Sequence, residues 1–284
     1  SRVSDAKFGL IGEAANSVGG YLAGAVPFGN LPGMNAREMT QKALKAYVLF
    51  NVEPAFDCAS GSEAADVIAK ADMVAVFSAF KSESALEFAD VLLPIAPFTE
   101  TPGTFVNCEG KAQSFYPVVK GLGDSRPGWK VLRVLGEMLG LAGFAADSVE
   151  GVRKAVFGSD SVVDSTKLNN LARGDVFSLG TGKQGLQRIA DIPIYFADPV
   201  VRRAPSLQAT QDSSEPAARM SRSTLDRVGV EPGVKVRVST GSGEAIVLAA
   251  EDDGVADGCV RLAGAHPLTV RLGALYGEVS VERL

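Results

Sequence analysis

The sequence predicts an α/β fold, in which a mostly parallel, doubly wound sheet domain is followed by a small C-terminal β-barrel domain. Over the first half of the chain, short apolar runs recur about every 20 to 25 residues with helical segments between them, the pattern of parallel βαβ units. After Ile192, short strands separated by turns replace the helices. We therefore place the sheet domain at residues 1–157, a polar linker at 158–191 and the barrel at 192–284.

The apolar runs and the segments between them give the elements of the first domain in order. Its predicted strands are Lys7–Ile11, Tyr47–Asn51, Met73–Ser78 and the run that begins at Val91. Its predicted helices are Ala36–Leu44, Glu63–Ala71 and Glu83–Ala89. Pro94 and Pro97 are expected to end the last strand by withdrawing backbone donors. Pro127 then precedes an amphipathic helix, and Ser148 is the predicted cap of a helix that reaches Phe157.

The C-terminal part contains the signals of a small barrel. The runs KVRVST and EAIVLAA flank a Gly-Ser-Gly turn at Gly241–Gly243, which predicts a hairpin. Shorter strands are expected at Gly258–Leu262 and Glu278–Val281, and a small helix at Ser223–Val228. The glycine-rich segment before them, Gly158–Gln187, is predicted to be part of the linker.

Composition and charge exclude some classes of function. The 284 residues are 46% hydrophobic and carry a formal net charge of −5, and no basic face is left for a nucleic-acid backbone. The longest apolar runs fall far short of the roughly 20 residues of a membrane span. Three scattered cysteines lack the close spacing of cluster or zinc ligands and favour a reducing, cytoplasmic compartment. The chain begins without Met or a signal-peptide pattern, so we expect an excised fragment of a longer protein.

The segment Ala89–Gln113 is the main candidate for a binding site. It joins an apolar strand to a polar loop, and ligands bind at the carboxyl ends of strands in open α/β sheets. Its polar side chains are those of Glu100, Thr104, Asn107 and Glu109. The alternative is an ordered surface loop whose polar side chains bind their own backbone.

Other motifs give no catalytic or metal residues. The glycines after the first strand and the segment Gly180–Gln184 lack a complete phosphate-loop pattern. His266 is the only histidine, and it is expected to be a surface or capping residue because no partner for acid–base work can be nominated.

Four stretches resemble a known family. The segment ADVLLPIAPFTETPGTFVNCEGKAQ (89–113) is similar to the molybdopterin oxidoreductase superfamily. Together with RPGWKVLRVLGEMLGLAGF (126–144), it most resembles the large G subunits of bacterial NADH-quinone oxidoreductase, respiratory complex I. GEAANSVGGYLAGAVP (12–27) and AYVLFNVEPAFD (46–57) agree. The resemblance covers the first half of the chain densely and the C-terminal third only loosely.

This resemblance implies a fold kept without its cofactor. Superfamily members that bind the pterin often have Asn-Pro after the second strand, near the dinucleotide, whereas this chain has Glu53 before Pro54 and adds Asp57. Carboxylates at such a rim repel phosphate by about 1–4 kcal/mol per charge pair. We therefore expect no pterin, unless Glu53 turns away into solvent. The vestigial cleft would be lined by Glu53, Asp57, Glu100, Thr104, Asn107 and Gln113.

The resemblance also implies a setting. The parent subunit would carry iron–sulfur clusters that pass electrons from NADH to quinone, while this fragment holds no cofactor and packs against other peripheral-arm subunits. It would lie on the cytoplasmic side of the bacterial inner membrane, attached to the membrane only through the complex. The alternative is half of an active molybdopterin-dependent enzyme, of the formate dehydrogenase or nitrate reductase type. A free-standing binding module is a third option.

Overall fold

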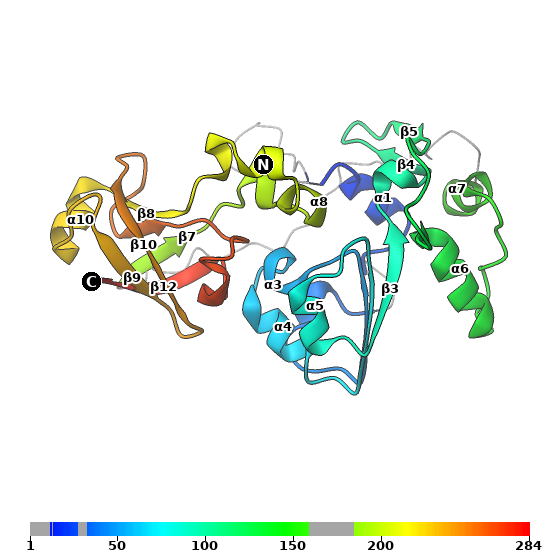
Figure 1. The fold of residues 1–284 in the computed structure, drawn as a ribbon, viewed down its shortest axis with the longest axis horizontal. Coiled ribbons are helices and arrows are strands. Elements are labelled where there is room, and N and C mark those ends of the chain that lie inside the picture. The colour runs from blue at the N-terminus through cyan, green and yellow to red at the C-terminus, as the bar shows by residue number, and fades with distance from the viewer. Residues whose placement is uncertain (1–11, 13, 28–32, 159–184) are drawn as a thin grey trace, which may run out of the picture. The chain divides into compact units, whose positions relative to one another are not determined.

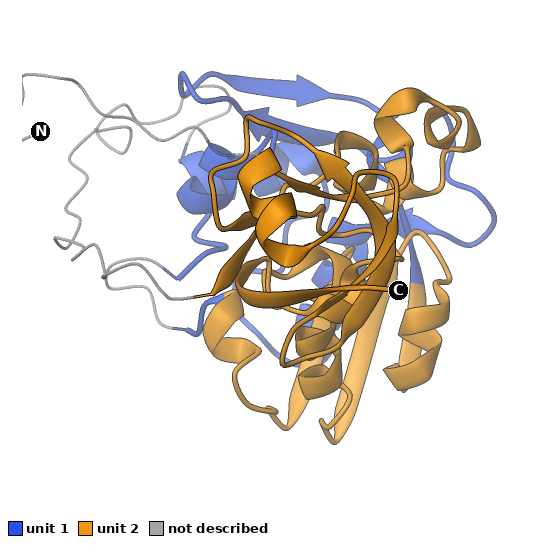
Figure 2. Cartoon of the chain, turned by 90° about the vertical axis from the view of Figure 1, so that its left-hand side faces the viewer, with its two compact units in different colours: residues 1–35, 94–178 blue, residues 36–93, 179–284 orange. Residues whose placement is uncertain are grey.

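The chain forms two compact units, each built from separate stretches of sequence (Figure 2). The computed structural model describes residues 12, 14–27, 33–158 and 185–284. One unit combines residues 1–35 with 94–178, and the other combines residues 36–93 with 179–284. The units therefore do not follow the predicted boundaries at 157 and 192, because the segment 36–93 packs with the barrel.

A four-stranded sheet has the order β1-β2-β3-β6. The strands are β1 (Ala46–Phe50), β2 (Met73–Ser78), β3 (Val91–Ala96) and β6 (Arg126–Pro127) (Figure 1). β1 and β2 are parallel, with Ala46 opposite Met73 and Phe50 opposite Phe77, and β3 pairs with β6 in the same sense. The strands predicted at Tyr47–Asn51 and Met73–Ser78 are thus confirmed.

The helices beside β1 and β2 bury the apolar core of this region. They are α4 (Ser62–Ile68) and α5 (Glu83–Phe88), each within three residues of its predicted bounds. Ser82 caps α5, since its hydroxyl accepts a hydrogen bond from the Ala85 N–H at 3.2 Å. The buried core residues are Tyr47, Leu49, Ile68, Val74, Val76 and Ala85.

Several predictions for the first domain need correction. The helix expected at Ala36–Leu44 is only one turn, α2 (Ala36–Met39). Pro94 does not end β3, which continues to Ala96; Leu93 and Pro94 are exposed, a position where a missing N–H is tolerated. The strand predicted at Lys7–Ile11 lies outside the described residues. Two short helices complete this region, α1 (Ser17–Leu22) and α3 (Pro54–Asp57).

The polar segment after β3 is a hairpin and not the loop that we predicted. A 3-10 turn, η1 (Phe98–Glu100), is followed by β4 (Gly103–Val106) and β5 (Ala112–Phe115), which pair antiparallel. The turn between them ends at Gly110, whose φ of 79° suits glycine. Phe105 and Phe115 then meet edge to face at 4.9 Å.

Two longer helices follow, as predicted. α6 (Gly128–Met138) begins after Pro127, and α7 (Val149–Phe157) begins after Ser148. The Ser148 hydroxyl accepts a hydrogen bond from the Gly151 N–H at 3.1 Å, which confirms the predicted cap.

The C-terminal strands close into a barrel with the order β10-β8-β11-β7-β12-β9. The strands are β7 (Leu186–Ile189), β8 (Ala217–Met220), β9 (Lys235–Ser239), β10 (Glu244–Glu251), β11 (Cys259–Arg261) and β12 (Tyr276–Arg283) (Figure 1). The hairpin around Gly241–Gly243 is confirmed by the antiparallel pairing of β9 and β10. β7 corrects the predicted linker, because residues 186–189 already belong to the barrel.

Short helices cover or connect the barrel strands. They are η3 (Ile194–Phe196), α8 (Pro199–Arg202), α9 (Pro205–Gln208), η4 (Gln211–Ser213), α10 (Arg222–Val228) and η5 (Val270–Leu272). The barrel core includes Met220, Leu225, Val236, Val260 and Leu262, all fully buried. The predicted fold class, a parallel α/β sheet followed by a β-barrel, is confirmed. No helix in the described part of the chain has the length and apolarity needed to cross a membrane.

Candidate functional site

The candidate site lies where the chain leaves β1 and starts α3. Asn51 adopts a left-handed conformation with φ of 52°, which asparagine tolerates better than most residues. Its N–H donates to the Phe77 carbonyl of β2 at 2.7 Å. Glu53 is the N-cap residue of α3, Pro54 opens the helix, and the Asp57 carboxylate accepts a hydrogen bond from the Glu53 N–H at 2.6 Å. This tight turn holds two carboxylates just beyond the carboxyl end of β1.

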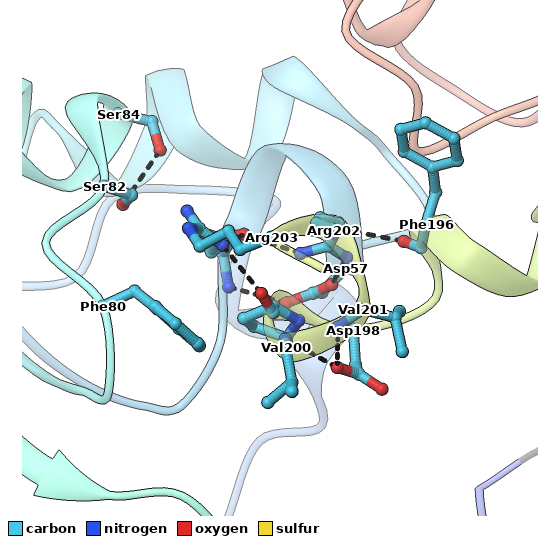
Figure 3. Close-up of polar contacts among 12 residues, drawn as sticks. Asp57, Phe80, Ser82, Ser84, Phe196, Asp198, Val200, Val201, Arg202 and Arg203 are labelled. Carbon is cyan, nitrogen blue, oxygen red and sulfur yellow. Dashed lines mark hydrogen bonds and ion pairs between the residues drawn. The ribbon is translucent and has the colours of Figure 1, made fainter. Parts of the chain in front are cut away.

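Two arginines from the other end of the sequence bind these carboxylates (Figure 3). Arg202 reaches Glu53 Oε2 through Nη1 at 2.7 Å and Asp57 Oδ1 through Nη2. Arg203 binds both oxygens of Glu53, Oε1 through Nη2 and Oε2 through Nη1. We call these four residues the ion-pair cluster. Two carboxylates and two guanidinium groups leave it without net formal charge.

The segment around α8 positions the arginines. Asp198 caps α8 by accepting hydrogen bonds from Val200 N–H at 2.7 Å and Val201 N–H at 3.1 Å, as Figure 3 shows. Arg202 Nε donates to the Phe196 carbonyl at 2.9 Å. Each guanidinium also lies over an aromatic ring, Arg202 over Phe56 at 5.0 Å and Arg203 over Phe80 at 4.8 Å. These contacts favour guanidinium groups over ammonium groups.

Burial and pairing oppose each other at Glu53. Its side chain is only 5% exposed, and burial, the largest single influence, would by itself raise its pKa. The hydrogen bonds and charges of Arg203 and Arg202 outweigh burial, so the pKa of Glu53 lies below its usual value. The expected repulsion of phosphate by unpaired carboxylates is therefore wrong, because both acids are neutralised. Glu53 does not turn into solvent either.

Segments 55–63 and 264–275 approach each other closely beside this cluster. The Leu275 N–H donates to the Ala59 carbonyl at 3.2 Å. The Ser242 hydroxyl, from the β9–β10 turn, also donates to Glu63 Oε1. The cavity between the two segments measures only about 10 Å³, which is close to the space that one water molecule needs. This contact is therefore essentially closed.

Arg188 of β7 lines this cavity and a neighbouring one of about 160 Å³. Its side chain is buried, and burial lowers its pKa to about 10. Nη1 donates to the Ala274 carbonyl at 2.9 Å and Nη2 to the Ala263 carbonyl at 3.2 Å. These bonds to backbone carbonyls tie the 263–274 segment to the barrel.

The other predicted cleft residues lie in the hairpin region and shape its backbone. Glu100 Oε2 accepts a hydrogen bond from Leu122 N–H at 3.1 Å. Asn107 Oδ1 accepts from the N–H groups of Glu109 at 3.1 Å and Lys111 at 2.9 Å. Thr104 shares a hydrogen bond with Ser114 at 3.0 Å, and Gln113 is exposed opposite Phe105. Glu53 and Asp57 meet in one cluster, while these four residues belong to the other compact unit.

His266 is buried and not at the surface, and the N-cap residue of η5 is Thr269. Its Nδ1 accepts a hydrogen bond from the Leu268 N–H at 3.1 Å, so that nitrogen carries no proton. Its ring packs against Phe196 with centroids 4.5 Å apart. Burial lowers the pKa of His266, and the charge of Glu215 opposes this only in part.

We expect His266 to make stability depend on pH. The pKa of His266 in the folded chain lies below the ordinary value of 6.5. The contribution of His266 to the free energy of unfolding is therefore full above pH 6.5 and is lost as the pH falls. The free energy of unfolding should decrease below pH 6.5 by at most about 1.4 kcal/mol per pH unit. His266→Asn, which keeps an acceptor near Nδ1, should lack this component in urea unfolding at pH 7.5 and 5.5. Equal pH slopes for both proteins would contradict this assignment.

The described residues contain no group of three or more His, Cys, Asp or Glu side chains placed to hold a metal ion. Cys58, Cys108 and Cys259 are free thiols, and burial, helped by the charge of Asp57, raises the pKa of Cys58. That thiol is therefore a poor nucleophile. Sequence reasoning missed Arg202, Arg203 and Arg188; the adjacent pair Arg202-Arg203 behind Asp198-Pro199 was the available signal.

The first part of the chain is similar to a known protein family. Residues 6–138 match the family described as Molybdopterin oxidoreductase. A chain of acetylene hydratase from Pelobacter acetylenicus has a similar fold, with a TM-score of 0.57 at 16% identity over 84% of this chain and 44% of that chain. That likeness concerns the fold alone.

Curated relatives span more than one kind of oxidoreductase. The "Probable oxidoreductase YjgC" of Bacillus subtilis is 35% identical over 40% of this chain and 12% of its own length. "Putative formate dehydrogenase YrhE" of the same organism is 30% identical over 38% and 11%. The mitochondrial "NADH dehydrogenase [ubiquinone] iron-sulfur protein 1" of Solanum tuberosum is 35% identical over 30% and 11%. The matched segments span about a tenth of the length of these relatives.

The geometry beside β1 does not fit a pterin dinucleotide. The turn after β1, which the resemblance places near the dinucleotide, packs against the barrel, and the cavity between them measures only about 10 Å³. Sites for ligands of drug size usually measure about 300–1,000 Å³. Both carboxylate oxygens of Glu53 are engaged by arginines. A dinucleotide would have to separate these segments.

Proposed function

We propose that this chain is a cofactor-free, structural part of the large subunit of a bacterial NADH-quinone oxidoreductase. The parent subunit would carry iron–sulfur clusters that pass electrons from NADH towards quinone, coupled to proton translocation. The ion-pair cluster is the observation that carries this proposal. It supports a structural role because it fills the strand end with the chain's own side chains. The likeness to the plant NADH dehydrogenase protein supports the choice of complex.

The cluster supports the absence of a cofactor because the arginines already occupy the carboxylates, and not because the carboxylates repel phosphate. A phosphate group that entered at Glu53 would have to displace buried charge-assisted hydrogen bonds from Arg202 and Arg203. Breaking a buried ion pair from one side costs about 3–5 kcal/mol. A ligand would have to recover that free energy before it gained any net affinity.

The proposed setting follows from the proposed complex. The chain would pack against other peripheral-arm subunits on the cytoplasmic side of the inner membrane and contact no nucleic acid. Its net charge of −5 supports the last point.

A second candidate is half of an active molybdopterin-dependent oxidoreductase of the formate dehydrogenase or nitrate reductase type. The likeness to YrhE and YjgC over more than a third of the chain favours it. It requires a metal ligand elsewhere in the parent and a barrel that opens to admit nucleotide. The closed contact near Gly61 and Leu275 counts against it.

Two measurements on the native parent protein separate these candidates. The first is molybdenum, tungsten and pterin content, by mass spectrometry of the metals and fluorescence of the oxidised pterin. The second is migration with NADH-oxidising activity in native gels of detergent-solubilised membranes. We expect negligible metal and pterin together with migration in the NADH-oxidising complex. One pterin and one metal per chain, with migration apart from that complex, would overturn the proposal in favour of the second candidate.

A further inference from the structure

The ion-pair cluster has the composition of a guanidinium-binding site. Its acceptors are the two oxygens of Glu53 and one oxygen of Asp57. Its walls are the rings of Phe56 and Phe80, each within 5.0 Å of a guanidinium carbon. Carboxylates that accept paired N–H groups, beside aromatic faces, match the planar fork of a guanidinium group. The same features suit neither a phosphate nor a small point charge.

The acceptors stand where open α/β sheets bind ligands. Glu53 follows β1 and Phe80 follows β2, so both come from the carboxyl ends of neighbouring parallel strands. The donors come from a segment about 150 residues further along the chain. The strand ends therefore act as the receptor, and the segment that carries Arg202 and Arg203 acts as an internal ligand.

The two arginines differ in how accessible they are. Arg202 is 8% exposed and uses all three nitrogens, on Glu53, Asp57 and the Phe196 carbonyl. Arg203 is 32% exposed, and its contacts are two oxygens of Glu53, the Pro199 carbonyl and the Phe80 ring. The Arg203 subsite therefore borders solvent, and a ligand could enter it without the departure of Arg202.

We propose that Glu53 and Phe80 form a guanidinium-binding subsite, which Arg203 fills in this chain and which accepts a free guanidinium-bearing molecule when Arg203 is removed. The ligand class comprises monosubstituted guanidinium ions and arginine side chains. This inference rests on the contacts of the cluster alone and is independent of which oxidoreductase the parent protein is.

The test is chemical rescue of Arg203→Ala in the whole chain. Thermal unfolding is followed with increasing methylguanidinium chloride, and with ammonium chloride at equal ionic strength. We expect the Tm of Arg203→Ala to rise with the logarithm of the methylguanidinium concentration, by about 2–4 °C at tenfold the dissociation constant. The original chain should show no such rise, because Arg203 already fills the subsite. A parallel series with L-arginine tests whether a complete amino acid fits as well.

A matched control uses an arginine in an exposed ion pair. Arg261 binds Asp191 at 3.2 Å, and both side chains are about half exposed. Arg261→Ala removes a guanidinium group of the same kind, but no buried subsite remains behind. We therefore expect methylguanidinium not to raise the Tm of this variant.

Two results would overturn the proposal. The first is an equal response of Arg203→Ala and Arg261→Ala to methylguanidinium, and the second is equal rescue of Arg203→Ala by ammonium. If Arg203→Ala does not fold in plain buffer, the yield of folded protein is measured after refolding with either salt. Recovery with methylguanidinium alone supports the subsite, and failure with both salts overturns it. Arg203→Gln, which keeps the stem beside Phe80, should show the same selectivity.

Discussion

Glu53→Gln should lower the free energy of unfolding by about 3–5 kcal/mol, the range for removing one partner of a buried ion pair. The substitution preserves the size of the side chain but removes the charge that both arginines face. Arg202 is nearly as buried as Glu53, so one guanidinium would be left with only Asp57 as a charged partner. The amide N–H groups of the new side chain would also face the N–H groups of the arginines, so donors would meet donors. Urea unfolding at pH 7 measures the change.

The effect of Glu53→Gln should depend on pH in a defined direction. The pKa of Glu53 in the folded chain lies below the ordinary value of 4.5. Its contribution is therefore full above pH 4.5 and is lost as the pH falls through the lower folded pKa. The difference between the original chain and Glu53→Gln should shrink in acid. A difference that stays constant from pH 7 to 3 would contradict the charge-based explanation.

Asp191→Asn is the matched control for this experiment. Asp191 also binds an arginine, Arg261, but both side chains are about half exposed. Exposed ion pairs contribute at most about 1 kcal/mol. Similar losses for Asp191→Asn and Glu53→Gln would mean that burial does not set the strength of the cluster.

The sequence predicted the elements whose signals are local. The run Met73–Ser78 became β2 with the same bounds, because a short apolar run fixes a buried strand. Ser148 caps α7 as expected, because a hydroxyl before a helix has a nearby N–H to accept from. The Gly-Ser-Gly turn likewise fixed the β9–β10 hairpin.

Elements that depend on distant partners could not be predicted in this way. β7 is four residues long and pairs with β11 and β12, more than 70 residues away, so the polar sequence around it indicated a linker. The prediction of the candidate site was incomplete for the same reason. Glu53 and Asp57 were correctly singled out, but their charges were treated as unpaired, because nothing local connects them with Arg202 and Arg203.

The hairpin after β3 shows a signal that was present but given too little weight. Thr104, Phe105 and Val106 are β-branched or aromatic, and the turn Asn107–Gly110 separates them from a second short run. Family resemblance drew attention to the polar residues as cleft walls. The β-branched and aromatic residues, which are enriched in strands, were the better guide to local structure.

Gly61→Ala should be strongly destabilising, by about 3 kcal/mol or more, because two penalties combine. Gly61 has φ of 58° and ψ of −133°, a backbone conformation that is essentially restricted to glycine. An added Cβ would also lie 2.7 Å from the Gly273 carbonyl oxygen. That oxygen belongs to the backbone, so no side-chain rotation relieves the clash. Relief would require segment 264–275 to move away from α4, which would open the closed contact beside the ion-pair cluster.

Urea unfolding of Gly61→Ala, with Gly241→Ala as its control, measures this effect. Gly241 lies in the β9–β10 turn, and a Cβ there would meet no atom within 4 Å, so we expect a change of no more than about 0.5 kcal/mol. Methyl NMR shifts at Leu275, whose N–H binds the Ala59 carbonyl, report whether the contact has opened. If Gly61→Ala is as stable as Gly241→Ala and leaves Leu275 undisturbed, segments 55–63 and 264–275 are not packed as described. The ion-pair cluster alone would then oppose the entry of a dinucleotide beside β1.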